Sequence, residues 1–302
     1  MKKSIKKVLA LLLAGVVVFS LVGCAGNNSS EDIDDMEDIT DDIGSIEEEI
    51  SKMAEENSSV KVGKYKVPSE SDFYWEEVDG GVVITEYTGT EKSVEIPSKL
   101  DGKDVKEIGS DAFINVEIVG VKLPDTVEKI NDEAFLYCTT LVEVIFGDSV
   151  IEIGKSAFEG CSALSKVELN NGLKIIGERS FGWTSSLKEI VIPSSVESIG
   201  SGAFGLGGLE KIEIPGSVKN IGNQAFADCS ALRKVVINDG VTTFDDRVFN
   251  YCSSLEKIEI PASVTAMGSQ VFNCCEKVTV YAPTGSYAET YAKDNGVEFK
   301  AS

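Results

Sequence analysis

The sequence predicts an α/β solenoid, a stack of similar coils with one parallel sheet and short helical or 3-10 segments on the other side. The first observation is a repeat: Phe recurs eight times at intervals of 22 or 23 residues, a period typical of a solenoid. The repeating residues are Phe113, Phe135, Phe158, Phe181, Phe204, Phe226, Phe249 and Phe272. The second observation is an alternation at the end of the unit, as in Ile190–Ile192, Ile212–Ile214 and Ile258–Ile260. This is the period of a strand with one buried face, so stacked coils are expected to join these strands in one sheet.

Two further columns of the repeat predict the corners of each coil. The position after the second Ile of the unit holds Gly in six units, and Asn131 or Asp245 in the other two. Since Gly, Asn and Asp tolerate a positive φ, we expect a left-handed corner there. A second corner begins at Pro in five units, such as Pro193. Between the corners, the apolar residues of 157–164 have the spacing of one or two helical turns that face inward.

The stack needs covers at both ends, because no single coil can bury its own apolar edge. Upstream of the first unit, a β-hairpin is predicted with Gly80–Gly81 as its turn. Downstream, Ser286 and Glu289 form a capping-box pattern, and Gly296 suits the end of the helix that follows. The predicted boundaries are 61–97 for the N-terminal cap, 98–283 for the repeats and 284–302 for the C-terminal cap.

The N-terminal segment predicts export. Its first seven residues carry four lysines, and residues 8–23 are an uncharged run of 16 residues, shorter than the roughly 20 that a membrane-spanning helix needs. The run Leu21–Cys24 resembles the lipobox of bacterial lipoproteins, which implies that the signal peptide 1–23 is removed and that Cys24 is lipidated. Two or more acyl chains hold a protein stably on a membrane, so we expect Cys24 to tether it outside the cytoplasm. A secretory signal peptide with a chance Cys is the alternative.

Residues 24–60 are predicted to form an acidic linker or stalk. From Glu31 to Glu56 the chain holds 13 acidic residues and one basic residue, Lys52. Met and Ile recur there at spacings of three and four, so a short helix is the alternative. A solvated, self-repelling chain is favoured because the flanking positions are acidic as well.

Composition excludes several classes of function. The formal net charge of -22 opposes binding to nucleic acid or anionic lipid, which need cationic neutralisation. The sequence has no His, which removes Ser-His-Asp and Cys-His nucleophile arrangements and every His-containing zinc site. Glu168 and Glu189 are considered as a glycosidase pair, but no apolar pocket is expected to separate their pKa values. We therefore predict no enzymatic activity, no cofactor and no metal.

Cysteine forms a column three places after the repeating Phe. Its members are Cys138, Cys161, Cys229, Cys252 and Cys275. Val116 and Thr184 fill the same slot in other units, so buried reduced thiols are favoured over disulfides or a thiolate metal site. Cys274 lies one place off the column and is expected to be more exposed.

The Pro, Gly, Ala-Phe and Cys columns recur together over roughly residues 96–283. In this combination the chain resembles the BspA-like leucine-rich repeat proteins of bacterial surfaces. The resemblance implies a leucine-rich-repeat solenoid, and it implies adhesion, meaning attachment to host matrix proteins or to other cells.

The outward side of the predicted sheet carries the candidate binding face. Its residues are Lys166, Glu189, Val191, Lys211, Lys234, Val236, Lys257 and Lys277. One interpretation is cross-strand Lys-Glu pairing that keeps the face soluble. The functional interpretation is a contact surface for an acidic or sulfated partner, with Val191 and Val236 as apolar anchors.

Three aromatic residues, Tyr137, Trp183 and Tyr251, stand two places after their Phe. They are candidates for a rim that stacks on sugars or protein, and packing within the coils is the alternative.

The sequence as a whole predicts a membrane-anchored cell-surface protein that binds a macromolecular partner, either an extracellular protein or a glycan. A uniform repeat leaves a broad, shallow face, which suits large partners better than small substrates. The alternative is a structural or spacer lipoprotein of the envelope with no specific external ligand.

Overall fold

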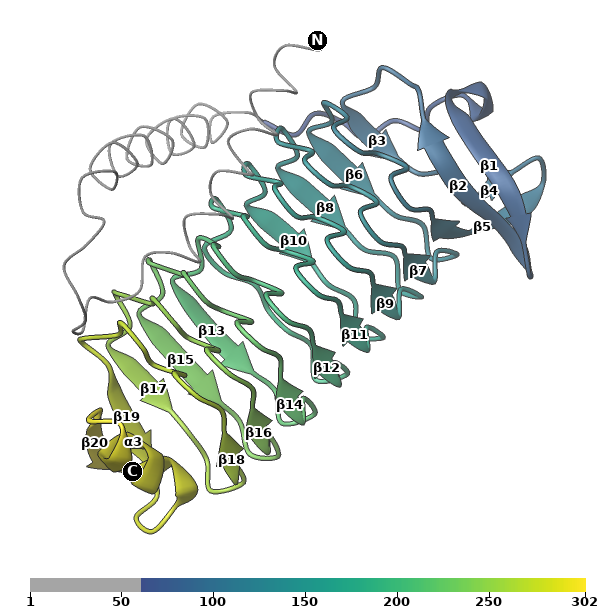
Figure 1. Cartoon of the computed structure of the whole chain (residues 1–302). Coiled ribbons are helices and arrows are strands. Elements are labelled where there is room, and N and C mark those ends of the chain that lie inside the picture. The colour runs from purple at the N-terminus through teal and green to yellow at the C-terminus, as the bar shows by residue number, and fades with distance from the viewer. Residues whose placement is uncertain (1–60) are drawn as a thin grey trace, which may run out of the picture. The chain divides into compact units, whose positions relative to one another are not determined.

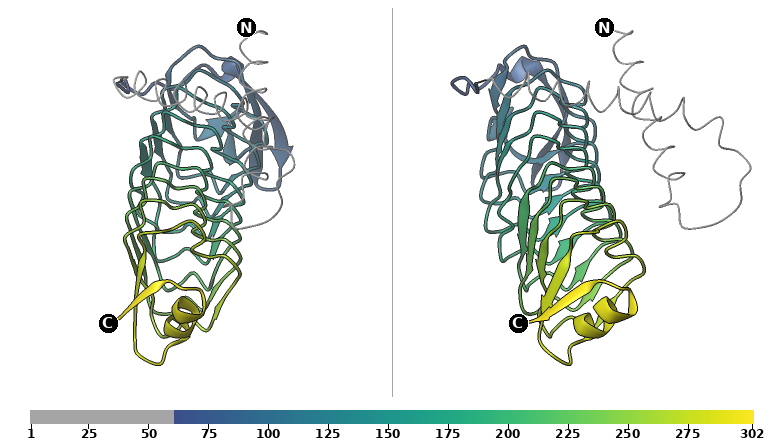
Figure 2. Two further views of the ribbon diagram at one scale, coloured as in Figure 1. Left: turned by 60° about the vertical axis from the view of Figure 1, so that its left-hand side comes forward. Right: turned by 90° about the vertical axis from the view of Figure 1, so that its left-hand side faces the viewer.

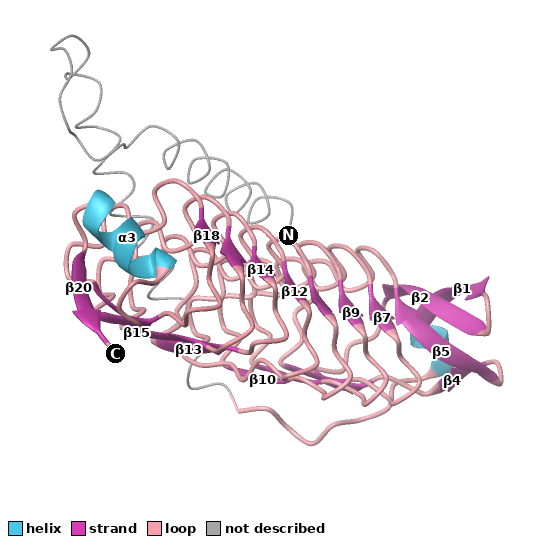
Figure 3. Cartoon of the chain, turned by 90° about the horizontal axis from the view of Figure 1, so that it is seen from below, coloured by secondary structure: helices cyan, strands magenta, loops and turns pink. Residues whose placement is uncertain are grey.

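The computed structural model describes residues 61–302, which form one stack of coils (Figure 1). The predicted signal peptide, Cys24 and the acidic segment lie outside the described residues. Successive coils place their strands in two columns on opposite sides of the stack (Figure 3). The predicted solenoid is therefore confirmed, and the second column of strands is an addition that the sequence did not predict.

The first column forms an 11-stranded sheet, here called the back sheet. Its strands are β1 (Phe73–Val78), β2 (Gly81–Tyr87), β4 (Lys99–Leu100), β5 (Lys103–Ile108), β7 (Lys129–Ile130), β9 (Glu152–Ile153), β11 (Ile175–Ile176), β12 (Ser198–Ile199), β14 (Asn220–Ile221), β16 (Thr243–Phe244) and β18 (Ala266–Met267). From β2 onward, neighbours along the stack pair in parallel, while β1 pairs with β2 and β4 with β5 in the antiparallel sense.

The second column, here called the front column, consists of two parallel sheets. The four-stranded sheet contains β3 (Ser93–Glu95), β6 (Gly120–Lys122), β8 (Glu143–Ile145) and β10 (Lys166–Glu168). The five-stranded sheet contains β13 (Lys211–Ile214), β15 (Lys234–Ile237), β17 (Lys257–Glu259), β19 (Thr279–Ala282) and β20 (Glu298–Ala301). Between β10 and β13 the predicted strand Ile190–Ile192 is not formed, so the expected single sheet is interrupted there.

The repeating Phe residues form a continuous ladder in the core, as predicted. Phe113 to Phe272 are buried, and adjacent rings lie with their centroids 4.8 to 6.0 Å apart. The caps extend this ladder, because Tyr87 stacks on Phe113 at 5.0 Å and Tyr291 meets Phe272 edge-on at 6.2 Å. Each such aromatic pair adds about 0.5–1.5 kcal/mol beyond its area burial, so the ladder favours coils in one register.

Consecutive turns replace the predicted short helices between the corners. In each of the eight coils, the residues two places before and two places after the Phe have a positive φ, as for Glu133 (φ 60°) and Tyr137 (φ 58°). A left-handed residue interrupts a right-handed helix, so no helix extends through this segment.

The column of Gly does not hold the left-handed corner, and this part of the prediction is wrong. Gly154 and the equivalent glycines are absent from the residues with a positive φ. A Cβ on Gly154 would lie 2.7 Å from the backbone carbonyl carbon of Asn131, and one on Gly200 would lie 2.6 Å from Glu178 N. The column holds small residues because neighbouring coils approach closely there.

Both predicted caps are present, with differences in detail (Figure 2). A 3-10 turn (Glu70–Asp72) precedes the hairpin of β1 and β2, whose turn is Asp79–Gly80, one residue earlier than expected. The helix α3 (Tyr287–Asp294) begins after Ser286, whose hydroxyl accepts from the Glu289 N–H at 3.3 Å.

The far end of α3 also follows the prediction. Gly296 has φ 69° just after the helix, and Ala288, Tyr291 and Ala292 form the buried side of α3. After the helix, β20 pairs in parallel with β19, which the sequence did not predict. Within residues 61–302, no helix is long and apolar enough to cross a membrane.

Candidate binding face

The first part of the front column is covered by the chain itself. Residues 61–68, here called the strap, lie against β3, β6 and β8. The Lys66 N–H donates to the Ser93 carbonyl at 3.0 Å, and the Lys66 carbonyl accepts from Glu95 at 2.8 Å. The exposed part of the front column therefore lies further along the stack.

One side chain of the strap reaches two strands beyond β3. The Tyr65 hydroxyl donates to Glu143 Oε2 at 2.6 Å, and burial together with this bond raises the pKa of Tyr65. Gly120 makes room for the strap, since a Cβ there would lie 2.7 Å from Val62 and 2.9 Å from the Tyr65 hydroxyl. This explains why Gly stands in an outward position of a strand.

Three of the predicted lysines lie directly opposite one another. Lys211 pairs in register with Lys234, and Lys234 pairs with Lys257. Like charges directly opposite each other on one face of a sheet are destabilising unless they are compensated. Stability alone therefore does not favour this arrangement.

Lys277 does not belong to the row, and its predicted place on the face is wrong. The residue opposite Lys257 is Thr279, and Lys277 lies in the turn that precedes β19. The reason is that Val280 takes the inward position opposite Ile258, which fixes the outward positions of β19 at Thr279 and Tyr281.

Ion pairs compensate most of the lysines of the face. Lys211 Nζ lies 2.7 Å from a Glu189 carboxylate oxygen, and the hydrogen bond between them raises the pKa of Lys211. Lys257 lies 2.8 Å from Glu259. Among residues 61–302, Lys234 makes no ion pair. The hydrogen bond from Lys257 lowers the pKa of Glu259, and the charge of Lys234 on the neighbouring strand contributes to this shift.

Lys166 is likewise paired, on the last strand before the interruption. It bridges Glu143 at 2.5 Å and Glu168 at 2.8 Å. The hydrogen bonds to these two carboxylates raise the pKa of Lys166, which holds it in the charged form.

Strand pairing between coils is lost on both sides of residues 189–192 in the front column. At the junction before, Val142 O accepts from Ser165 N at 3.0 Å, and further along the stack Arg233 O accepts from Glu256 N at 3.0 Å. In the described part of the chain, Ser165 O accepts no equivalent bond from Lys188. Residues 189–192, here called the break, consequently lie between β10 and β13 without pairing with either strand.

The break opens the wall of the solenoid. Val167 is half-buried, whereas Val144 and Val121, the inward residues opposite it on β8 and β6, are fully buried. On the break itself, the side chain of Val191 is 83% exposed. Apolar surface that the other coils enclose is thus accessible at this point.

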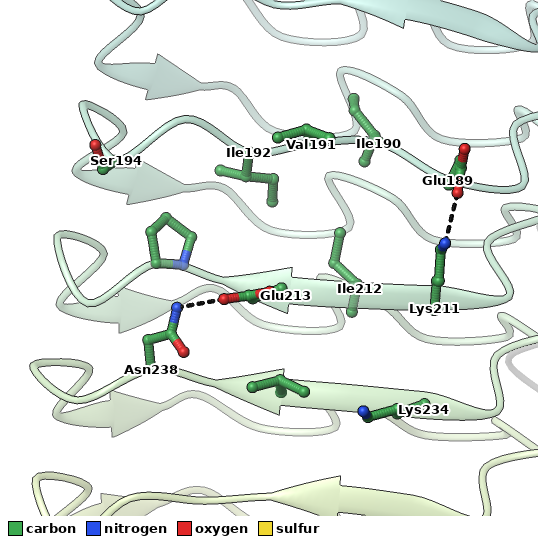
Figure 4. A pocket seen from close by; sticks show the side chains of 12 residues that line it. Glu189, Ile190, Val191, Ile192, Ser194, Lys211, Ile212, Glu213, Lys234 and Asn238 are labelled. Carbon is green, nitrogen blue, oxygen red and sulfur yellow. Dashed lines mark hydrogen bonds and ion pairs between the residues drawn. The ribbon is translucent and has the colours of Figure 1, made fainter.

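A groove with a volume of about 550 Å³ lies beside the break (Figure 4). Its lining comes from the break, β13 and β15 and the turns that follow them. The lining residues are Glu189, Ile190, Val191, Ile192, Ser194, Lys211, Ile212, Glu213, Pro215, Lys234, Val236 and Asn238. Asn238 donates to Glu213 Oε1 at 2.8 Å, which holds this carboxylate to one side of the groove. Five candidate residues of the sequence, Glu189, Val191, Lys211, Lys234 and Val236, therefore meet around one apolar depression.

The two glutamates considered for catalysis form ion pairs with lysines. Glu168 pairs with Lys166, and Glu189 with Lys211. The hydrogen bond from Lys211 lowers the pKa of Glu189, whereas a general acid at neutral pH requires a raised value. The arrangement fits contact with a partner and does not fit acid catalysis.

The three candidate rim aromatics do not form one surface. They occupy left-handed positions in separate coils, and Gly160, Leu206 and Asp228 stand in the same position of the coils between them. Tyr137 lies over Gly160, where an added Cβ would overlap its ring. For Tyr137 this geometry favours packing between coils.

The cysteine column is buried in the core, and the prediction of reduced thiols is confirmed. Each of the five thiols donates to the Phe carbonyl of the preceding coil at 2.9 to 3.2 Å. Burial raises the pKa of Cys138 and of Cys229 to about 12, so these thiols stay protonated at neutral pH. Among the described residues, no group of three or more His, Cys, Asp or Glu is arranged to hold a metal ion.

Comparison with known proteins identifies the repeat. A family model described as a BspA type leucine-rich repeat region matches residues 106–232 and 206–290, with six copies. A leucine-rich repeat protein of T. pallidum (TpLRR) is similar in structure, with 28% identity, a TM-score of 0.60, and coverage of 78% of this chain and 98% of that one. A leucine-rich cell surface protein of Faecalibacterium prausnitzii shows 24% identity, a TM-score of 0.46, and coverage of 73% and 77%. Among curated proteins, no sequence matches.

Proposed function

Because the chain belongs to the BspA-type leucine-rich repeat family, we propose that it is a cell-surface protein that binds a macromolecular partner through its front column. Leucine-rich repeat proteins generally bind protein partners. The partner would contact the front column from β10 to β17, beyond the strands that the strap covers. In this function the solenoid is a rigid support, and the outward side chains supply the recognition.

The groove beside the break is the observation that carries the proposal. It combines an exposed apolar side chain, Val191, with Lys234, which forms no ion pair within residues 61–302. Covering Val191 removes apolar surface from water, which contributes roughly 25 cal/mol per Å² buried. A shallow depression of this kind suits a residue of a large partner better than an enclosed small molecule.

Adhesion is the biological role that we infer from the family. The partner in this role is an extracellular protein or a glycan on host matrix or on another cell. The lipid anchor at Cys24 and the acidic segment 24–60 would hold the solenoid away from the membrane. The lysine-rich residues 1–7, the uncharged run 8–23 and the lipobox-like Leu21–Cys24 support the anchor.

A spacer role without an external ligand is the second candidate. The cross-strand ion pairs of the front column support it, because pairs such as Lys122 with Glu95 at 2.9 Å keep a sheet face soluble without a partner. The two candidates differ in whether the row of Lys211, Lys234 and Lys257 takes part in binding a partner.

The test compares binding by the wild type with binding by a charge-reversed face. The full-length chain is screened against matrix proteins, glycans and bacterial cells, and positive ligands are tested again with the triple variant Lys211→Glu, Lys234→Glu, Lys257→Glu. We expect binding and its salt dependence to be lost. The matched control is Lys277→Glu, which reverses an exposed lysine in the turn before β19 and should leave binding intact. A screen without ligands, or binding that survives the triple reversal, favours the spacer.

A further inference from the structure

We propose that the break, residues 189–192, is the docking site for an extended acidic segment of a partner polypeptide. In this mode an apolar side chain of the partner lies between Val191 and Val236, and a carboxylate of the partner pairs with Lys234. The inference rests on the proposed function and goes further by naming the class of partner and its mode of contact.

Backbone groups at the break are available to a partner. On the intact side of β10, Phe146 N donates to Glu168 O at 3.2 Å, as adjacent coils do elsewhere in the column. Within the described chain, Leu169 N and Val191 O make no corresponding bond. An extended polypeptide supplies both donors and acceptors at the spacing that such backbone groups require.

The apolar part of the groove fits one side chain at a time. Val191 and Val236 stand on either side of the coil that carries Glu213, and Asn238 holds the Glu213 carboxylate by a bond of 2.8 Å. Ile212, the inward neighbour of Glu213 on β13, also lines the groove (Figure 4). An apolar residue inserted between Val191 and Val236 would contact an aliphatic side chain on each side.

The positive charge of Lys234 favours an acidic segment of the partner. Lys234 has Lys211 and Lys257 as its in-register neighbours, and both of these are paired with glutamates while Lys234 is not. A carboxylate placed on Lys234 relieves the repulsion within the row. Lys234 and Val236 are two residues apart on β15, so their side chains leave the same face of the strand.

The strap favours a polypeptide over a carbohydrate. Residues of the strap already lie on the same column in an extended form, with a parallel bridge from Lys66 to Val94 and the Tyr65 hydroxyl on Glu143. Among residues 61–302, by contrast, no aromatic residue lines the groove, and aromatic rings are the usual platform for a sugar. The front column is thus a surface on which an extended chain is already accommodated.

The experiment uses a display library of random linear dodecapeptides, panned on the full-length chain in detergent. Enriched peptides are synthesised, and their dissociation constants are measured by fluorescence anisotropy. We expect enrichment of sequences that place Asp or Glu two positions from Val, Ile or Leu. Binding should weaken about tenfold in Lys234→Glu and in Val191→Ser, because each removes one of the two contacts. N-methylation of a central peptide amide should weaken binding as well.

Two matched controls separate this site from general surface effects. Lys277→Glu makes the same charge change outside the row, and Ile175→Ser makes a comparable apolar change on the back sheet, where Ile175 is 41% exposed. Both should stay within about twofold of the wild type. Because Val191 and Lys234 are exposed, thermal unfolding of all four variants should match the wild type.

The negative outcomes are distinguishable. No enriched peptide, or peptides whose affinity is the same in Lys234→Glu and Val191→Ser, overturns this inference. If a glycan or a folded protein from the screen still loses binding in the triple lysine variant, the proposed function stands with a different occupant. If the triple variant changes nothing, the proposed function fails with it.

Discussion

The hydroxyl group of Tyr65 donates a hydrogen bond of 2.6 Å to the carboxylate of Glu143, a residue 78 positions further along the chain. This bond fixes the strap on the front column. Tyr65→Phe should lower the free energy of unfolding by about 1.5–3 kcal/mol, since a hydrogen bond to a charged group is lost while Glu143 keeps its ion pair with Lys166. Urea denaturation measures this loss, and limited proteolysis should detect faster cleavage within residues 61–68.

The control for Tyr65 is Tyr74→Phe, because the side chain of Tyr74 is 61% exposed on β1. It should leave both stability and proteolysis unchanged. Equal effects of the two substitutions would mean that the strap is not held by the Tyr65 bond.

The Phe ladder predicts a large cost for one missing ring. Phe158 is fully buried and stacks on Phe135 at 5.0 Å and on Phe181 at 5.3 Å. Phe158→Ala should destabilise the fold by about 3–5 kcal/mol through the cavity it leaves, while Phe299→Ala on the terminal strand β20 should cost clearly less. Calorimetric unfolding of both variants compares them, and similar losses would contradict the central role of the ladder.

A carboxyl group in the turns predicts a pH dependence of stability. Burial raises the pKa of Asp228 from 3.8 to about 6. The folded state therefore binds the proton of the Asp228 carboxyl more tightly than the unfolded state does. The free energy of unfolding is highest below about pH 4, where this carboxyl is protonated in both states, and it falls as the pH rises to about 6. Asp228→Asn removes this dependence, and its advantage over the wild type should be greater at about pH 7 than at about pH 4, by on the order of 1 kcal/mol.

Denaturation of the wild type and Asp228→Asn at both pH values gives the difference directly. Asn also suits the left-handed backbone at this position, but that benefit is the same at every pH. A constant difference between the two proteins would show that the Asp228 carboxyl does not titrate in this range.

The anchor proposal predicts a change of location. Cys24→Ser removes the residue that the lipobox-like run would modify, so the protein should move from the membrane fraction to the medium. Metabolic labelling with a fatty acid should mark the wild type and leave Cys24→Ser unmarked. Retention of the variant in the membrane fraction would contradict a lipid anchor at this position.

The repeat made most of the fold predictable. The Phe ladder and the inward alternation of strands such as Ile212–Ile214 recur in nearly every coil, so the stack, its core and its two caps followed from spacing. The positive φ values two places before and after each Phe, as at Glu133 and Tyr137, were not predictable from the sequence. The residue types at these positions vary and are not restricted to Gly or Asn. The two-residue strands of the back sheet are too short to show a period of their own.

The binding face was predictable in composition and only partly in geometry. Lys211, Lys234 and Val236 were found from their columns, whereas the two-residue shift in the last coil misplaced Lys277. The break was not predictable, because its sequence has the same alternation of apolar residues as the intact strands. The difference lies in the missing hydrogen bonds between coils. The contact of Tyr65 with Glu143 joins distant segments, and no local pattern signals it.

Hydrogen exchange of the full-length chain, with and without a ligand recovered from the binding screen, shows which surface a partner covers. If the partner binds the front column, backbone amides in residues 189–192 and in β13 and β15 should exchange more slowly when the ligand is bound, with the back sheet unaffected. Protection confined to the back sheet, to the turns that carry Tyr137 and Trp183, or to the caps would contradict binding at the front column.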